Sequence, residues 1–280
     1  MSDSSSRVRR GFSLIELIIT IVLVAIIGAA AGRMLMSQTR FYARLAGQRD
    51  ARSVTRNARN IIQTELAMVE AGGGVAAASN SSITVRMPYA WGVFCSGNTI
   101  MRLPVDSAMY AMATIAGYAI KDTTATGAFT YTATTSAPTA GTATNCTTTA
   151  GITAPVNGDY LALSPAVTLP ALSGAGAPMY LYQTITYSFA ASGLVSGKRG
   201  LFRQVGAGTA EEILAPFDTT AKFRFYELAS TTAQTTVPAL ANIRGVELVL
   251  DAQSPKRASN RDTPEASSIR TAIFFRNRVD

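Results

Sequence analysis

The chain has 280 residues, of which 48% are hydrophobic and only 15% charged, and its formal net charge is +8. It contains no histidine and two cysteines, which excludes imidazole catalysis, histidine-ligated metals, four-cysteine zinc sites and iron–sulfur clusters. Soluble globular chains carry nearer a quarter charged residues, so we expect apolar residues to be concentrated in one segment.

The N-terminal segment supplies that concentration. Residues 1–11 hold three arginines against one acid, and residues 12–32 form an apolar run that is interrupted by a single acid, Glu16. As a helix this run rises about 31 Å, roughly the hydrocarbon thickness of a bilayer. A secretory signal peptide has a shorter apolar region and a small-residue cleavage site, which residues 29–31 match only weakly. The segment therefore predicts a membrane-spanning helix.

Glu16 needs an explanation, because a carboxylate on a membrane helix is costly and marks a functional site by default. Alone, it would also fit a side chain that reaches back to the membrane surface. However, the residues from Gly11 to Leu17, Gly-Phe-Ser-Leu-Ile-Glu-Leu, resemble the type IV prepilin signature. The resemblance implies cleavage after Gly11 by a prepilin peptidase and N-methylation of the new N-terminus, Phe12. Residues 1–11 are then a leader peptide.

The same resemblance assigns a role in assembly to Glu16. A buried amine and a buried carboxylate are each costly alone and less costly together, so Glu16 of one subunit is expected to pair with the Phe12 amine of the next. The leader arginines place the N-terminus in the cytoplasm by the positive-inside rule. Seven arginines between residues 33 and 59 oppose this orientation. The signature outweighs them, because the cleavage site must face its cytoplasmic enzyme.

Two glycines in the span, Gly28 and Gly32, form a GxxxG pair that permits close helix packing. The alternative is that they only loosen the helix. Many major pilins carry a proline at the position of Arg33, and its absence favours a minor subunit.

Residues 33–70 predict an amphipathic continuation of the helix outside the membrane, ended by the glycines at 72–74. One face is apolar and is expected to pack on the C-terminal domain: Ala51, Val54, Ala58, Ile61, Ile62, Leu66 and Val69. A second face carries Arg49, Arg52, Arg56 and Arg59. Because few aromatic residues are interleaved, this face favours solvent or subunit contact over DNA, and nucleic acid stays an open alternative.

Residues 71–280 are rich in strand patterns, and a long helix followed by antiparallel strands is an α+β arrangement. The predicted strands are 83–87, 181–189, 201–205, 222–226, 246–250 and 271–275, with 181–189 and 201–205 as a hairpin. Between about 113 and 179 lies a Thr/Ala/Gly-rich insertion, predicted to form extended loops or weak surface strands rather than core. It is either a solvated insertion or an exposed adhesive surface.

The C-terminal strands resemble those of minor pilins of the PilW type and minor pseudopilins of the J type. The matching segments are 201–203 (Leu-Phe-Arg), 223–226 (Phe-Arg-Phe-Tyr), 243–246 (Ile-Arg-Gly-Val) and 274–277 (Phe-Phe-Arg-Asn). The fold implied is type IV pilin-like, with the long helix packed on an antiparallel sheet.

Cys95 and Cys146 are expected to form a disulfide, since the domain is placed in an oxidising compartment. No catalytic motif is present, and the neighbours Glu211 and Glu212 would point to opposite faces of a strand. Calcium ligands are conceivable at Asp218, Asp251 and Asp262 but lack ligand spacing, so we expect no metal and no cofactor.

The sequence thus predicts a structural minor pilin or pseudopilin that initiates or caps a filament, and not an enzyme. Its expected partners are other pilin or pseudopilin subunits, the prepilin peptidase, an inner-membrane assembly platform and the membrane. Its expected location is the inner membrane as a single-pass protein, and then a periplasmic or extracellular filament. The alternative is a membrane-anchored, filament-borne adhesin or DNA-uptake module.

Overall fold

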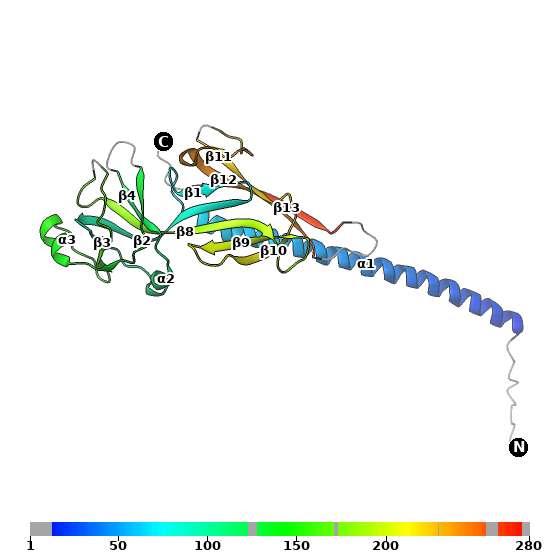
Figure 1. Ribbon diagram of the computed structural model, residues 1–280. Helices are drawn as coiled ribbons and strands as arrows, with labels where there is room; N and C mark the ends of the chain where they lie inside the picture. The colour runs from blue at the N-terminus through cyan, green and yellow to red at the C-terminus, as the bar shows by residue number, and fades with distance from the viewer. Residues whose placement is uncertain (1–12, 123–127, 171–172, 229, 256–262, 276–280) are drawn as a thin grey trace, which may run out of the picture.

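The computed structural model describes residues 13–122, 128–170, 173–228, 230–255 and 263–275. A long helix leads into an elongated β-rich domain and projects far beyond it (Figure 1). One long helix followed by antiparallel strands confirms the predicted α+β fold class.

Helix α1 (Leu14–Leu66) has 53 residues and is therefore about 80 Å long. No proline interrupts it. It ends one turn before Glu70, where the sequence predicted its end. After Leu66 the backbone N–H groups of Met68 and Val69 bond three residues back, to Glu65 and Leu66, which ends the α-helix. Val69 and Val75 both enter the core, and the chain reverses between them. Gly72 and Gly73 make this reversal with positive φ angles of 78° and 122°.

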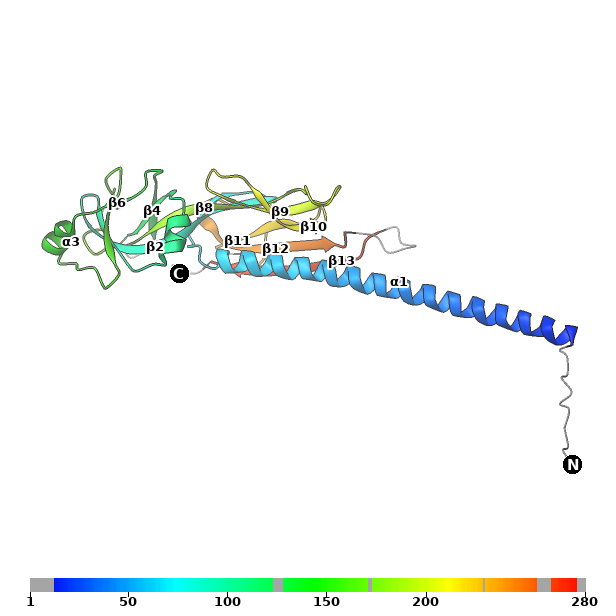
Figure 2. The same ribbon diagram turned by 90° about the horizontal axis from the view of Figure 1, so that it is seen from below.

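The β-rich domain has a proximal lobe, which lies beside α1, and a distal lobe beyond the end of the helix (Figure 2). Two long antiparallel strands, β2 (Ser82–Ser96) and β8 (Pro178–Ala191), run through both lobes. Their register shifts between Pro88 and Ala90, close to the boundary between the two hydrophobic cores. The lobes are therefore one continuous sheet structure rather than two linked domains.

The proximal lobe contains four of the predicted strands, at 201–205, 222–226, 246–250 and 271–275, together with β1 (Val75–Ala78) and β10 (Glu211–Phe217), which the sequence pattern missed. All are antiparallel to their neighbours: β1, β9 (Arg199–Val205), β10, β11 (Lys222–Glu227), β12 (Ile243–Gln253) and β13 (Ala266–Phe274). β8 and β9 form the predicted hairpin. A short 3₁₀ turn (Leu240–Asn242) precedes β12.

The core of the proximal lobe forms where one face of α1 packs on β10, β12 and β13. The buried helix residues are Ala51, Thr55, Ala58, Ile62 and Leu66. The predicted apolar face is confirmed at four of these positions but is wrong for Ile61, which is 38% exposed because it lies about 100° around the helix from Ile62. Thr55 was missed because it is polar. Its hydroxyl donates to the carbonyls of Ala51 and Arg52, which allows it to be buried.

The distal lobe holds the Thr-rich stretch and has cores of its own. Its elements are β3 (Thr99–Arg102), α2 (Ser107–Met112), β4 (Gly117–Lys121), β5 (Phe129–Ala133), β6 (Thr139–Ala140), α3 (Ala143–Ala150) and β7 (Asp159–Ala162). The prediction of loops and surface strands is wrong for β4, in which Tyr118, Ala119 and Ile120 are fully buried. β4 pairs with both β5 and β8, so neither of its edges faces solvent.

Candidate functional site

The N-terminal half of α1 stands free of the domain. Every residue from 13 to 31 is exposed, including large apolar side chains such as Leu14 (79%) and Ile27 (66%). α1 is long and apolar enough to cross a membrane by length and composition, and its most apolar window is 0% buried. A helix that is apolar on all sides requires an apolar environment, which the described chain does not supply.

Glu16 is the single charged residue between positions 13 and 32. It lies in the first turn of α1, where the exposed amide groups of the helix favour a negative charge. Thr20 donates its hydroxyl hydrogen to the backbone carbonyl of Glu16 at 2.7 Å, and no described residue pairs with the carboxylate. The predicted cleavage site, Gly11 and Phe12, lies outside the described residues, so cleavage, methylation and pairing with Glu16 stay predictions.

Gly28 and Gly32 lie one turn apart on the free half of the helix. A Cβ atom added at either position would meet nothing within 4 Å. Both therefore offer an open backbone surface on which a second helix can approach closely. Their role in helix packing stays a prediction.

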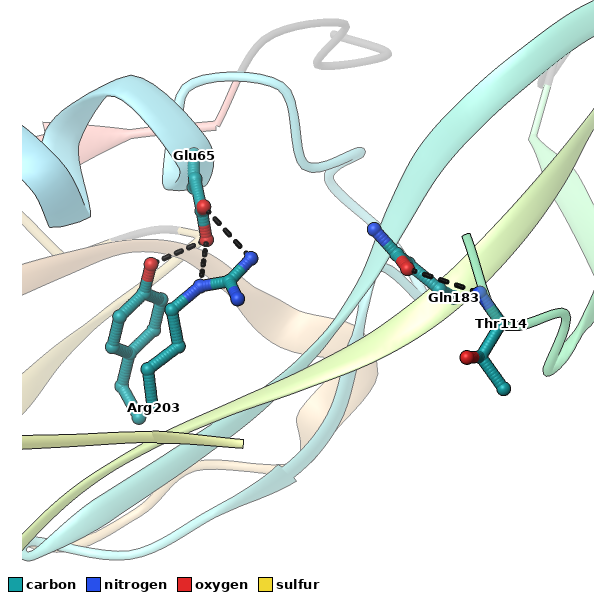
Figure 3. A network of polar contacts seen from close by, with 5 residues as sticks. Glu65, Thr114, Gln183 and Arg203 are labelled. Atoms are coloured by element: carbon teal, nitrogen blue, oxygen red, sulfur yellow. Dashed lines mark hydrogen bonds and ion pairs between the residues drawn. The ribbon is translucent and has the colours of Figure 1, made fainter. Parts of the chain in front are cut away.

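The other end of α1 is fixed to the sheet by a polar cluster, shown in Figure 3. Arg203 on β9 donates to Glu65 on α1 from Nε (3.3 Å) and from a terminal nitrogen (3.0 Å). Tyr187 on β8 also donates to Glu65. Burial raises the pKa of Tyr187, and its hydrogen bond to the Glu65 carboxylate raises it further, so this phenol stays protonated. The cluster joins α1 to β8 and β9 and sets the rotation of the helix on the sheet.

Sequence reasoning missed this cluster. The sequence pattern places Arg203 in a hairpin strand, but its ion-pair partner, Glu65, lies 138 residues away. The available signal was Glu65 itself, an acid that directly precedes the buried Leu66 at the end of an amphipathic helix.

The predicted arginine face is exposed to solvent. Arg49, Arg52, Arg56 and Arg59 all lie on the outer side of α1, and the first three line a shallow groove with Ser53 and Asn57. A second groove, nearer the apolar half, is lined by Arg33, Arg40 and Arg44 together with Met36, Ser37 and Phe41.

The two cysteines lie at the tip of the distal lobe. Cys95 on β2 and Cys146 on α3 are joined in a disulfide, with 4.8 Å between their Cα atoms, and both are buried. The bridge fixes α3, which has only eight residues, to β2.

The acidic residues considered as a catalytic pair or as calcium ligands form no common site among the described residues. Glu211 is exposed, whereas Glu212 accepts hydrogen bonds from Ser192 and from the backbone N–H of Gly193. Asp218 lies beside Asp251, while Asp262 is outside the described residues. Among the described residues, no group of three or more His, Cys, Asp or Glu side chains is placed to hold a metal ion.

Comparison with known proteins gives one match. The family described as the prokaryotic N-terminal methylation motif matches residues 6–32. This range includes Gly11, Phe12, Glu16 and the apolar start of α1. No curated protein and no solved structure matches the chain. The motif indicates a type IV pilin-like protein with a membrane anchor at its N-terminus.

Proposed function

We propose that this protein is a minor structural subunit of a type IV pilus or a type II secretion-like filament, and that it initiates or caps assembly through its hydrophobic helix. The observation that carries the proposal is the free apolar half of α1, which combines the methylation motif with a single charged residue, Glu16. Such a helix is stable in a bilayer or among other apolar helices, and a filament core supplies the second environment.

Processing would adapt the helix to both environments. Cleavage after Gly11 removes three arginines and one aspartate, so the net charge falls from +8 to +8 − 3 + 1 = +6. It leaves an amine on Phe12, which Glu16 of a neighbouring subunit neutralises. The pair is four residues apart in sequence, so it sets a short and fixed axial step between neighbours.

The proposed location and partners follow from this anchor. Before processing the chain is a single-pass protein of the inner membrane with a cytoplasmic N-terminus, where the prepilin peptidase meets residues 1–11. Afterwards an inner-membrane assembly platform transfers it into a filament of pilin or pseudopilin subunits. The resemblance of the C-terminal strands to the PilW and J types supports a minor rather than a major subunit.

A second candidate is a filament-borne adhesin or DNA-uptake module. It is favoured by the distal lobe, which lies at the opposite end of the molecule from the free half of α1 (Figure 2). Trp91 is 41% exposed there, and its ring lies 4.6 Å from that of Tyr180 and 6.4 Å from that of Phe129. Tyr180 is buried beneath it, so Trp91 is an exposed aromatic side chain on a rigid aromatic support, which is suitable for contact with a ligand.

Deletion of the gene and complementation distinguish the two functions. Loss of surface fibres on deletion, with recovery on complementation, supports the structural subunit. Normal fibre number with loss of adhesion or DNA uptake supports the second candidate. Normal fibres together with normal adhesion and uptake would contradict both.

A further inference from the structure

The extracytoplasmic stretch of α1 carries an unusual charge. Between residues 33 and 59 there are seven arginines and one acid, Asp50, which gives 7 − 1 = +6 over about 40 Å of helix. Arginine is always protonated in proteins, so the seven positive charges do not depend on pH. Three-quarters of the net charge of the precursor is therefore concentrated in one helical rod.

The positive charge is present on more than one side of the helix. Arg33 and Arg40 differ by about 20° in rotation and lie on the side that, further along, buries Ala51 against the sheet. Arg52 and Arg56 lie about 100° to 140° away from Arg33. These four arginines are exposed. A helix that docks on either of these sides of α1 therefore meets arginine side chains.

A second copy of this chain would be a poor neighbour for this helix. Pairing of Glu16 with the Phe12 amine of the next subunit offsets two copies by four residues, or about 6 Å. Two arginine stretches of about 40 Å would then overlap almost completely. Packed helices lie 8–10 Å apart, about one screening length at physiological salt, so the like charges would repel each other.

We propose that the neighbour of this helix in the filament is a different subunit, whose own extracytoplasmic helix carries acidic residues over the same stretch. The proposal rests on the proposed filament function and names the partner chemistry of its assembly helix. The protein then enters the filament between acidic helices, and electrostatics limits how many copies stand side by side.

The exposed apolar residues favour a helix over a polyanion such as DNA. Met34, Leu35, Met36, Phe41 and Tyr42 are each more than half exposed and are interspersed among the arginines. A packed helix covers such side chains, whereas the phosphates of DNA do not. Lipid head groups extend only about 5–7 Å beyond the hydrocarbon, so they reach the region of Arg33 but not Arg52 or Arg56.

A charge-reversed copy of the same chain provides a defined acidic partner. Arg33→Glu, Arg40→Glu, Arg52→Glu and Arg56→Glu together change the stretch from +6 to −2. The matched control carries Gln at the same four positions, which removes the charge without reversing it. Processed chains labelled at the C-terminus with a donor or an acceptor dye are mixed in phosphatidylcholine vesicles, and energy transfer reports association.

We expect the wild type to associate with the acidic copy at least tenfold more tightly than with itself, with the Gln copy between the two. At 1 M salt the difference should largely disappear, because the screening length falls to about 3 Å. Equal association of wild type with wild type and with the acidic copy would overturn the proposal. So would a DNA duplex that dissociates the mixed pair at physiological salt.

A further variant separates this proposal from the filament function on which it rests. The three pairs are wild type with the acidic copy, with the Gln copy and with itself, in order of decreasing affinity. Glu16→Ala in both labelled copies should weaken every pair while leaving this order unchanged. If Glu16→Ala has no effect but the order holds, the pairing mechanism fails and the acidic-partner proposal stands. If Glu16→Ala weakens every pair but the order is absent, the acidic-partner proposal fails alone.

Discussion

Glu65 on helix α1 and Arg203 on strand β9 form a bidentate ion pair, although they are 138 residues apart in sequence. The shortest N–O distance is 3.0 Å. Both side chains are about three-quarters covered, with 23% and 28% of their surface exposed. The pair lies at the end of α1 and holds the helix in one rotation on the sheet.

Removal of the Glu65 side chain should lower the stability of the contact between α1 and the sheet. Glu65→Ala leaves the Arg203 guanidinium and the Tyr187 hydroxyl without their acceptor, so we expect a loss of about 1–3 kcal/mol in the free energy of unfolding. Glu65→Gln keeps an acceptor and should lose less. Urea unfolding of the detergent-solubilised chain measures both, with Asp50→Ala, at an exposed acid on the same helix, as the control. Equal midpoints for Glu65→Ala and Asp50→Ala would contradict a stabilising role for the Glu65 cluster.

The sequence predicts the features that depend on neighbouring residues, but not those that depend on partners far away along the chain. The span, the helix face at Ala51, Ala58 and Ile62, and the proximal strands other than β1 and β10 follow from local periodicity. The Glu65 cluster and the buried strand β4 do not, because each depends on pairing partners that are more than fifty residues away. β4 precedes a threonine-rich stretch that masks it in the sequence, and its first four residues are buried because β8 pairs with them.

Alkaline pH should destabilise the distal lobe. Burial raises the pKa of Tyr131 to about 12, and the Tyr131 hydroxyl lies 2.8 Å from that of Tyr180. A raised folded-state pKa means that folding favours the neutral phenol. Its stabilising contribution is complete below the unfolded value of about 10 and is lost as pH rises towards 12. Tyr131→Phe should reduce the loss of unfolding free energy between pH 9 and 11.5. An unchanged pH profile in this variant would rule out the assignment.

The disulfide should stabilise the distal lobe more than the proximal one. Closing a loop of about fifty residues contributes roughly 4 kcal/mol in the chain-entropy model. Replacement of Cys95 and Cys146 by serine should increase hydrogen exchange in α3 and β3, while β12 and β13 change little. Mass spectrometry of the unreduced protein provides the direct check, and two free thiols would reject the bridge.

The topology of the anchor can be tested with reporter fusions. We expect residues after Arg33 to lie outside the cytoplasm despite the arginines there, because the N-terminal signature sets the orientation. A reporter that is active only in the periplasm, fused after Gly74, should be active. Activity of a cytoplasm-only reporter at the same position would contradict the orientation.

Processing and assembly should depend on different residues. Gly11→Leu alters the junction that the peptidase must accept, so the full-length +8 precursor should persist in the membrane. Glu16 lies beyond the junction, and Glu16→Ala should be cleaved normally. A shift in gel mobility distinguishes precursor from mature chain, and normal cleavage of Gly11→Leu would place the cleavage site elsewhere.

Incorporation of Glu16 variants into sheared filaments tests the central claim most directly. Glu16→Ala leaves the Phe12 amine of the adjacent subunit buried without a partner, at a cost of roughly 3–5 kcal/mol. At about 1.4 kcal/mol for each tenfold change, incorporation should fall a hundredfold or more. Glu16→Gln keeps the shape without the charge and should fail nearly as badly. The account predicts processed but unincorporated chains for both variants; wild-type amounts of both in the filaments would contradict it.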